Sequence, residues 1–240
     1  MPESLRGREV LLVGGAGGLG AASSRLLAAE GARLIVGYRS RLDRAREFEA
    51  FGQVVQADIT RAEDRTKLLD AAPDLYGLVV FAGDPARSKT PGELEAAIRL
   101  SMEVNYLGPI LLAREAAGRM RSRGTQGAIV LFSTMQAVAV FPGSTAYAGA
   151  KAALLHASRI LAKECRGPAN IRVNAICPGV MAAGMAEASI ASGKYERYRD
   201  EGAIPRFGRP EDIARAVRLF LEPDSYITGQ ALSVDGGLSL

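Results

Sequence analysis

The chain contains few of the residues on which metal centres and hydrolytic triads are usually built. Its 240 residues include one histidine, two cysteines and no tryptophan. The histidine, His156, is predicted to lie on the helix face opposite Tyr147, where we expect a packing or subunit-contact role. With no second histidine, a histidine-based metal site and a Ser-His-Asp hydrolase have poor support, and we expect no metal. Cys165 and Cys177 lack a CxxC spacing and lie among apolar neighbours, which predicts reduced packing residues.

Long apolar runs and concentrated charge are missing as well. No stretch of about 18 uncharged apolar residues is present, which argues against a membrane span. The N-terminal sequence has no apolar secretion segment, so we expect a cytoplasmic protein. Lysine and arginine (30) only slightly outnumber aspartate and glutamate (26), and no basic stripe is interleaved with aromatics. Nucleic-acid binding therefore has little support, whereas a net charge of +4 suits an anionic cofactor or substrate.

Short apolar runs alternate with helix-like segments along nearly the whole chain. This βαβ alternation predicts an α/β fold, namely a single-domain Rossmann-type doubly wound parallel sheet of about seven strands with helices on both faces. We expect strands at 9–13, 33–38, 53–57, 77–82, 127–132, 171–176 and 231–234. We expect helices near 18–30, 42–51, 61–71, 92–123, 145–165 and 210–221.

Two segments suggest features beyond the sheet itself. The longest irregular region, about 179 to 209, includes a helix-like Ala182–Arg199 stretch. A connection of that length in a compact domain is usually functional, which predicts a substrate lid around 181–207. The helix at 145–165 is apolar on nearly all sides, so we expect the sheet and a second subunit to cover it in a homo-oligomer, a dimer or tetramer.

A glycine-rich turn follows the first predicted strand and opens the first predicted helix. Glycines let the backbone turn sharply and approach a pyrophosphate, and the helix N-terminus attracts the anion. A merely flexible glycine-rich turn is the alternative. We expect dinucleotide binding by the loop residues Gly14, Gly15, Ala16, Gly17, Gly18, Leu19 and Gly20.

The end of the second predicted strand indicates which dinucleotide binds. In doubly wound folds this position meets the adenosine ribose, where an acidic residue accepts from the 2′-hydroxyl and arginine accommodates a 2′-phosphate. The chain has Tyr38, Arg39, Ser40 and Arg41 there, with no carboxylate at the turn. Two guanidiniums and a hydroxyl suit a dianionic phosphate, so NADP(H) is favoured over NAD(H), although a solvated basic loop is the alternative.

Tyr147 and Lys151 are four residues apart on a predicted helix and therefore share one face. A phenol is a poor acid or base at neutral pH because its reference pKa is near 10. A cation beside it favours the phenolate and makes it a usable proton donor or acceptor. Since an exposed pair can arise by chance, the pattern has chemical meaning only if a cofactor and a substrate reach it.

The chain resembles the short-chain dehydrogenase/reductase family from about residue 5 to 237. The resemblance is carried by motifs in the family's order and spacing. Besides the glycine loop and Tyr-x-x-x-Lys, these are Asp58-Ile59, Ala82-Gly83, Val104-Asn105, Arg172-Val-Asn-Ala-Ile-Cys-Pro178-Gly179, Arg209-Pro-Glu-Asp-Ile-Ala, Tyr226-Ile-Thr-Gly-Gln and Val234-Asp-Gly-Gly. Length and the closing pattern look most like 3-oxoacyl-acyl-carrier-protein reductases.

The resemblance implies a role for each matching residue. Tyr147 would be the general acid in carbonyl reduction or the base in alcohol oxidation, and Lys151 would lower its pKa and hold the nicotinamide ribose. Asn105 would position a water that relays protons to Lys151. Thr134 would hydrogen-bond the substrate oxygen, with Ser133 as the alternative hydroxyl. The cofactor would also contact Asp58, Ile59, Ala82, Gly83, Pro178, Gly179 and Val180.

The chain departs from the family pattern at four positions that bear on the cofactor. Val13 replaces a threonine before the glycine loop, Val80 and Phe81 replace two asparagines, and Ala183 replaces a threonine. None of these is a proton-transfer residue.

We expect an NADPH-dependent enzyme that reduces a carbonyl of a small molecule, a 3-oxoacyl thioester or another ketone. Two alternatives stay open. One is an alcohol, sugar or steroid dehydrogenase that runs toward oxidation, because the same residues serve both directions. The other is a non-catalytic NADP(H)-binding sensor or scaffold.

Overall fold

Seven parallel strands form one sheet in a computed structural model that describes residues 5–88 and 90–240. Residues 1–4, part of the N-terminal sequence in which we find no secretion segment, and Lys89 lie outside the described residues. The strand order is β3-β2-β1-β4-β5-β6-β7, as expected for a doubly wound sheet. The strands are β1 (Glu9–Val13), β2 (Arg33–Tyr38), β3 (Gly52–Gln56), β4 (Leu75–Val80), β5 (Gly127–Phe132), β6 (Ile171–Pro178) and β7 (Ala231–Val234).

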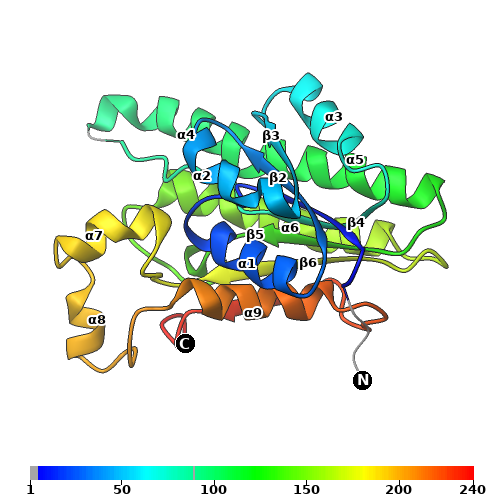
Figure 1. The fold of residues 1–240 in the computed structure, drawn as a ribbon. Coiled ribbons are helices and arrows are strands. Elements are labelled where there is room, and N and C mark those ends of the chain that lie inside the picture. Colours follow the sequence, from blue (N-terminus) through cyan, green and yellow to red (C-terminus); the bar gives the residue numbers. More distant parts are fainter. Residues whose placement is uncertain (1–4, 89) are drawn as a thin grey trace.

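Helices cover both faces of the sheet (Figure 1). They are α1 (Gly18–Ala29), α2 (Leu42–Ala45), α3 (Ala62–Asp70), α4 (Leu94–Met102), α5 (Gly108–Ser122), α6 (Thr145–Glu164), α7 (Glu187–Ala191), α8 (Glu196–Asp200) and α9 (Pro210–Leu221). Among the described residues, no helix combines the length and apolarity needed to cross a membrane.

Two predicted helices are wrong in detail. The stretch 92–123 is divided by a π-helical turn at Glu103–Leu107, followed by Pro109 in the first turn of α5. Proline cannot donate to the carbonyl four residues earlier, so a regular helix cannot run through this point. The stretch 42–51 is α-helical only to Ala45 and continues as a 3₁₀ helix.

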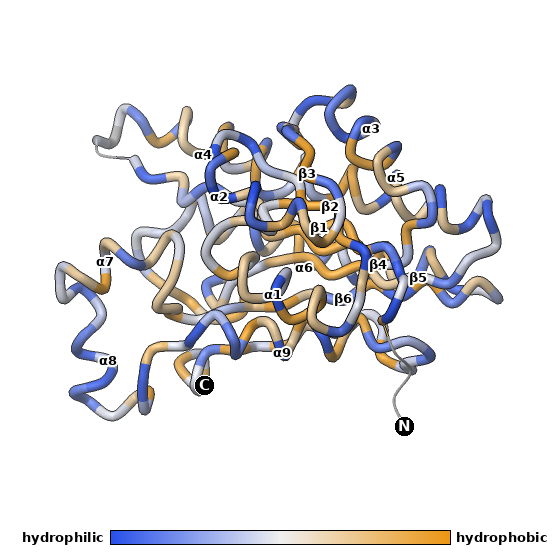
Figure 2. The backbone as a smooth tube through the Cα atoms, viewed as in Figure 1, coloured by the Kyte–Doolittle hydropathy of each residue, from blue (hydrophilic) through white to orange (hydrophobic). Residues whose placement is uncertain are grey.

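Alternate side chains of each central strand enter different cores, which is why the strands are continuously apolar. In β1, Leu11 and Val13 pack toward α3, α5 and α6, whereas Val10 and Leu12 pack toward α1 and α9. The tube coloured by hydropathy shows the same arrangement, with hydrophobic strands inside and hydrophilic segments at the periphery (Figure 2). Burial on both faces is typical of parallel sheets between helices.

The connections from β1, β4, β5 and β6 leave the same edge of the sheet because the strands are parallel. The strand order reverses between β1 and β4, since β2 and β3 lie on one side and β4 to β7 on the other. Crevices at such reversal points are where doubly wound folds bind ligands. The fold therefore brings the glycine loop, residues 81–88, residues 133–144 and the 181–207 segment together.

The 181–207 segment is closed at its base by a short parallel bridge. Met181 pairs with Gly208, with Gly208 N donating to Val180 O at 3.0 Å and Ala182 N donating to Gly208 O at 2.7 Å. The helix-like stretch Ala182–Arg199 contains two short helices, since α7 ends at Ala191 and α8 begins only at Glu196. Gly193, with a φ of 75°, supplies the left-handed residue that separates the two short helices.

Candidate active site

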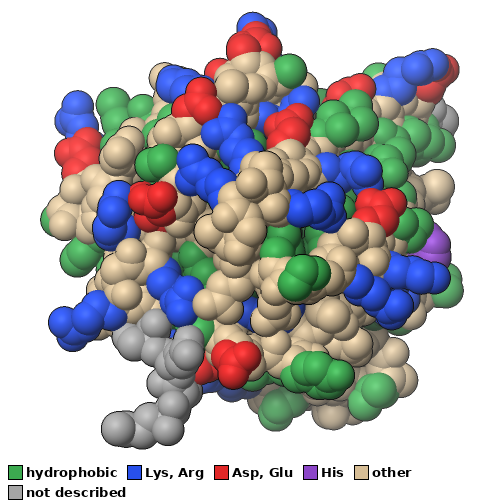
Figure 3. Space-filling view, turned by 90° about the vertical axis from the view of Figure 1, so that its right-hand side faces the viewer, with side chains coloured by type: hydrophobic (Ala, Val, Ile, Leu, Met, Phe, Trp, Pro, Cys, Tyr) green, Lys and Arg blue, Asp and Glu red, His purple; other side chains and the backbone are tan. Residues whose placement is uncertain are grey.

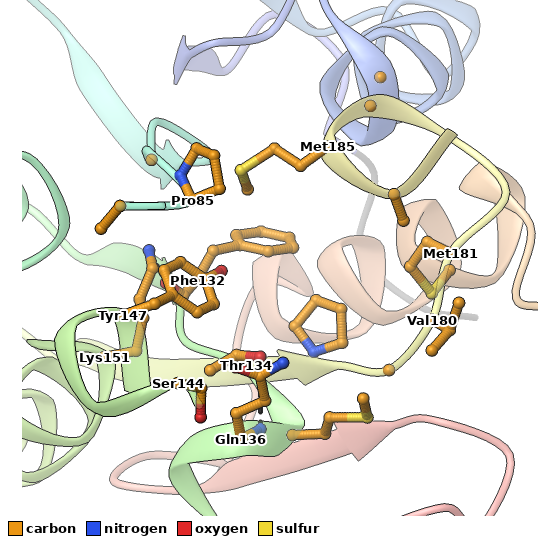
Figure 4. Close-up of a pocket in the computed structure, with 18 of the residues that line it drawn as sticks. Pro85, Phe132, Thr134, Gln136, Ser144, Tyr147, Lys151, Val180, Met181 and Met185 are labelled. Atoms are coloured by element: carbon orange, nitrogen blue, oxygen red, sulfur yellow. Dashed lines mark hydrogen bonds between the residues drawn. The ribbon is translucent and has the colours of Figure 1, made fainter. Parts of the chain in front are cut away.

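A cavity of about 1520 Å³ opens at the reversal point of the sheet. Figure 4 shows its centre, with Tyr147, Thr134 and Lys151 on one side and Met181 and Met185 on the other. The cavity is lined by fourteen of the predicted site residues, namely Gly14, Gly17, Gly18, Leu19, Gly20, Arg41, Ala82, Gly83, Thr134, Tyr147, Lys151, Pro178, Gly179 and Val180. The other predicted residues, Gly15, Ala16, Tyr38, Arg39, Ser40, Asp58, Ile59 and Asn105, lie outside this lining.

The glycine loop has the geometry of a phosphate cradle. Gly14 has a φ of 80°, and a Cβ on Gly20 would lie 2.2 Å from Gly14 O, so both positions require glycine. A Cβ on Gly17 would instead meet open space. The loop is held to α1 by Ser24 Oγ, which donates to Gly15 O at 2.9 Å. The start of α1 lines the cavity through Gly18, Leu19 and Gly20, and the N-terminus of a helix is suited to bind a pyrophosphate.

Tyr147 and Thr134 bring two hydroxyls into the cavity (Figure 4). Thr134 begins a short 3₁₀ turn, and its Oγ1 accepts from Gln136 N at 3.3 Å. Ser133 is held differently, because its buried Oγ donates to Lys151 O at 2.9 Å and so ties β5 to α6. Since Ser133 uses its single hydroxyl proton within the protein, Thr134 is the better placed partner for a substrate oxygen.

Burial dominates the proton affinities of the Tyr147 and Lys151 pair. It raises the pKa of Tyr147 to about 12, against a smaller opposing effect of the Thr134 hydroxyl. It lowers the pKa of Lys151 to about 8, and Lys151 Nζ donates to Phe132 O at 2.7 Å. The pKa of Tyr147 is thus raised by desolvation, and Lys151 is not among the causes of this shift, so the role of Lys151 in lowering it stays a prediction.

Asn105 lies behind the cavity, in the π-helical turn before α5. Its buried amide pairs with the backbone of Asp84, since Nδ2 donates to Asp84 O at 2.8 Å and Oδ1 accepts from Asp84 N at 2.9 Å. Nδ2 also donates to Ser101 Oγ at 3.0 Å. Pro109 removes the N–H that an α-helix would direct at Asn105 O. The side chain therefore holds the loop after β4, and the backbone carbonyl is the group suited to a water.

Gly83 lies between Asn105 and Lys151. A Cβ built on Gly83 would lie 3.0 Å from Asn105 Oδ1 and 3.5 Å from Lys151 Nζ. A side chain here would crowd both polar groups, so the absence of one keeps the path between them open.

Arg39 and Arg41 differ at the predicted 2′-phosphate site. Arg41 is engaged with Asp43 through Nε to Oδ1 at 3.0 Å and Nη2 to Oδ2 at 2.7 Å. Arg39 is exposed, and no carboxylate within the described chain forms an ion pair with its guanidinium. Its backbone is held by Gln56 Nε2, which donates to Arg39 O at 3.0 Å. Arg39 is therefore the freer of the two cations for a ligand phosphate.

The Asp58 and Ile59 pair follows β3 beside Arg39. Asp58 Oδ1 accepts from both the backbone N and the hydroxyl of Thr60, at 3.0 and 2.8 Å. Ile59 is buried in the core, and its carbonyl accepts from Arg65 Nη1 at 3.0 Å. Within the described residues, the second oxygen of the Asp58 carboxylate accepts no hydrogen bond, whereas the Ile59 side chain belongs to the core.

The departures from the family pattern have apolar surroundings. Val80 is part of the core. Phe81 packs against Phe132 with ring centroids 4.4 Å apart, and both rings line the cavity. Ala183 is buried at the cavity edge, and Val13 lies in the core at the end of β1. Hydrophobic packing thus replaces the side-chain hydrogen bonds that the usual residues would make.

Several residues that line the cavity were not singled out from the sequence. Gln136, Ser144, Pro85, Arg87, Lys194 and Arg197 are among them. Gln136 and Ser144 flank Thr134 and Tyr147, and their nearness in sequence to those residues is a signal that could have found them. Arg87, Lys194 and Arg197 come from two distant segments and share no motif.

Comparisons with known proteins match this chain, over nearly its whole length, to dehydrogenases and reductases. The chain matches the family model described as enoyl-(acyl carrier protein) reductase over residues 14–239. It is 33% identical to 3beta-hydroxysteroid dehydrogenase 1 of Eggerthella lenta, covering 100% of this chain and 97% of the relative. It is 32% identical to the 3-oxoacyl-[acyl-carrier-protein] reductase of Thermotoga maritima, covering 98% of each. A short-chain type dehydrogenase/reductase from Mycobacterium ulcerans superposes with a TM-score of 0.88 at 28% identity, covering 99% of this chain and 91% of that one.

Proposed function

The chain belongs to the short-chain dehydrogenase/reductase family and is an oxidoreductase of carbonyl or alcohol groups; within that class, we propose that it uses NADPH to reduce a ketone, such as a 3-oxoacyl thioester, to an alcohol. One observation carries the proposal. A single cavity has the phosphate-cradling glycine loop at one end and the hydroxyls of Tyr147 and Thr134 at the other.

In the reductive direction that we propose, the Tyr147 phenol, which holds its proton at neutral pH, is the proton donor. In the oxidative direction the same residue would act as the base. Bound NADPH would supply the hydride. Thr134 would donate to the carbonyl oxygen and orient it toward Tyr147, whose proton would pass to that oxygen as it gains negative charge. Lys151 and a water on Asn105 O would then return a proton to Tyr147.

The remaining residues would hold the cofactor. The glycine loop would take the pyrophosphate, Asp58 the adenine, and the backbone of Pro178, Gly179 and Val180 the carboxamide. We also propose that the chain acts as a single domain, with the 181–207 segment as a lid hinged at the Met181 and Gly208 bridge. Exposed apolar side chains on α4 and α6, including Leu100 and Ile160, support a homo-oligomer.

The proposal is tested by following NADPH oxidation with a panel of ketones and 3-oxoacyl thioesters. We expect turnover of at least one member, and reduction faster than oxidation at neutral pH. If NADPH binds but no carbonyl compound is reduced, the sensor alternative replaces the enzyme.

Cofactor choice depends on Arg39. We expect Arg39→Asp to raise the KM for NADPH at least about tenfold and to leave the KM for NADH nearly unchanged, because a charge-assisted contact to the 2′-phosphate is replaced by repulsion. Steady-state kinetics with both cofactors measures this. Arg41→Asp is the matched control and should have a smaller effect, since Asp43 already engages Arg41. Equal effects of Arg39→Asp on both cofactors would contradict the 2′-phosphate assignment.

The choice between Thr134 and Ser133 is tested with three variants. We expect Thr134→Ser to keep most activity and Thr134→Val to lower kcat by roughly 100-fold, because only valine removes the hydroxyl. Ser133→Ala should instead lower the unfolding free energy by about 1 kcal/mol through loss of its bond to Lys151 O. Kinetics combined with denaturant unfolding separates the two roles. A larger kcat loss for Ser133→Ala than for Thr134→Val would reverse the assignment.

A further inference from the structure

Besides Arg41, Arg44 and Lys151, the cavity lining contains three cations from two distant segments. Arg87 follows β4, and Lys194 and Arg197 belong to the 181–207 segment; all three are exposed side chains that line the cavity. Glu187 is the only carboxylate residue in the cavity lining of the described chain. The glycine loop, Arg41 and Arg44 also line the cavity, and the cofactor's phosphates would lie against the loop. This loop meets the start of the 181–207 segment, because a Cβ on Gly18 would lie 3.1 Å from Gly184 Cα.

Around α8, basic side chains of the 181–207 segment line the cavity and acidic side chains do not. The segment contains as many acidic as basic residues around α8, yet Glu196 pairs with Arg199, whose guanidinium lies 5.2 Å from the Phe207 ring centroid. Asp200 and Glu201 do not line the cavity, whereas Lys194 and Arg197 do. On the face shown in Figure 3, basic and acidic side chains are interleaved. In the described part of the cavity lining, Lys194 and Arg197 form no ion pair, although the Tyr198 hydroxyl and, from outside the lining, Glu201 raise the pKa of Arg197.

The three cations have weak partners within the protein. Arg87 Nη2 donates to Met185 O and to Ser189 Oγ, both at the long distance of 3.4 Å. Lys194 Nζ lies 5.5 Å from the Tyr195 ring centroid. The Arg197 guanidinium lies 5.0 Å from the Tyr198 ring centroid, and its Nη2 donates to the Tyr198 hydroxyl at 3.3 Å. The two tyrosines stack with centroids 6.1 Å apart. Within the described chain, none of the three cations forms an ion pair with a carboxylate.

Arg87 also connects the two sides of the cavity entrance. Its contacts with Met185 and Ser189 join the loop after β4 to the start of the 181–207 segment, and Pro85 of that loop and Met185 both line the cavity shown in Figure 4. An anion bound there would be shared between the loop and the segment. Arg87 would donate charge-assisted hydrogen bonds to the anion, which are stronger than its present bonds to the Met185 carbonyl and the Ser189 hydroxyl.

We propose that the substrate carries an anionic group, a carboxylate or a phosphate, which Arg87, Lys194 and Arg197 hold while the carbonyl lies at Thr134 and Tyr147. This rests on the proposed reductase function and adds the charge of its substrate. The stacked Tyr195 and Tyr198 rings and Met185 give the same region apolar contact area, so the substrate combines an apolar part with an anionic end.

The experiment compares matched neutral and anionic substrates. A 3-oxo acid is paired with its methyl ester, and a 3-oxoacyl-CoA with the corresponding N-acetylcysteamine thioester, which lacks the phosphates. We expect kcat/KM to favour the anionic member of at least one pair about tenfold or more. The pair that shows the preference identifies carboxylate or phosphate. No preference in either pair would overturn the proposal.

The variants Arg87→Gln, Lys194→Gln and Arg197→Gln should reduce that preference while leaving the neutral substrate and the KM for NADPH nearly unchanged. Arg199→Gln is the matched control, because Arg199 is paired with Glu196 and should not alter the preference. A preference that survives the triple variant would overturn the proposal. An Arg87→Gln effect on the KM for NADPH alone would assign Arg87 to the cofactor and likewise overturn it.

Binding is measured separately so that the two proposals can fail independently. Wild type and the triple variant, each saturated with NADP⁺, are titrated calorimetrically with a non-reducible pair, hexanoate and its methyl ester, and with CoA. Anion-selective binding that the triple variant loses would support the anion site even if no carbonyl compound were reduced. Equal binding of neutral and anionic probes would reject it even in an active reductase.

Discussion

Tyr147→Phe should lower kcat by roughly 100- to 10,000-fold while leaving the fold and NADPH binding intact. The substitution removes only the phenolic oxygen, which lies in the cavity beside Thr134. The ring remains packed near Ala86, Ala97 and Ala146, so the change in unfolding free energy should be small. A carbonyl that accepts hydride then lacks the phenol that would transfer a proton to its oxygen, and only the hydrogen bond from Thr134 remains, since the buried Ser133 hydroxyl is committed to Lys151 O.

The measurement is single-turnover NADPH oxidation together with NADPH binding by fluorescence quenching. Tyr226→Phe is the matched control, because Tyr226 is fully exposed and lies outside the cavity. Unchanged turnover in Tyr147→Phe would remove this residue from the mechanism. A wild-type protein that binds NADPH but does not oxidise it with any carbonyl compound would instead support the sensor alternative.

Lys151→Met should have the second largest effect, because it should lower activity and raise the stability of the folded protein. Lys151 is 2% exposed, and its Nζ donates to Phe132 O at 2.7 Å. Methionine has a similar length but no charge, so proton return and the ribose contact are lost. We expect kcat to fall about 100-fold or more. In contrast, the protein without cofactor should become more stable at pH 7, because a desolvated ammonium is removed.

The pH dependence of this stability difference follows from the pKa of Lys151. Burial lowers it from 10.5 to about 8, so between these values the unfolded chain binds a proton that the folded chain has released. Stability of the wild type therefore rises with pH across this window, and the penalty is complete only below about pH 8. The shift limits the gain in unfolding free energy of Lys151→Met to about 3 kcal/mol. Loss of the hydrogen bond to Phe132 O reduces this gain by about 1 kcal/mol.

Denaturant unfolding of wild type and Lys151→Met from pH 7 to pH 10 tests this. The advantage of the variant should shrink as the pH rises. Above pH 10 the raised pKa of Tyr147 acts in the opposite direction, because the unfolded phenol loses its proton first. Lys163→Met, an exposed position on the same helix, is the control and should show no such trend. A difference independent of pH would contradict the lowered pKa.

The strands and the ligand loop could be predicted because their determinants are local. Residues 9–13 form a strand as expected, since a run of apolar side chains suits burial on both faces whatever lies against them. The glycine loop could be located because only residues without Cβ permit the φ of Gly14 and the approach of Gly20 to Gly14 O. The hydroxyl and amine at Tyr147 and Lys151 could be placed on one helix face from their spacing alone.

Proton affinities and charge pairing could not be predicted in this way. The pKa of Tyr147 is raised rather than lowered, because the residues that bury it come from several elements and desolvation depends on all of them. Arg39 and Arg41 are equivalent in the sequence, and only the folded turn engages Arg41 with Asp43. The break between α7 and α8 depends on one left-handed glycine in a segment whose composition suggests a continuous helix.

The amino-acid sequence by itself determined the parallel sheet, the glycine loop and the helix face shared by Tyr147 and Lys151, because backbone conformation and side-chain period are properties of neighbours in the chain. Only the tertiary structure decided that the Ser133 hydroxyl bonds to Lys151 O, how tightly Tyr147 and Lys151 hold their protons, and that Arg87 lies within 3.4 Å of the segment that carries Lys194 and Arg197. Solvent exclusion and charge proximity arise from residues far apart in sequence, so no local pattern encodes them.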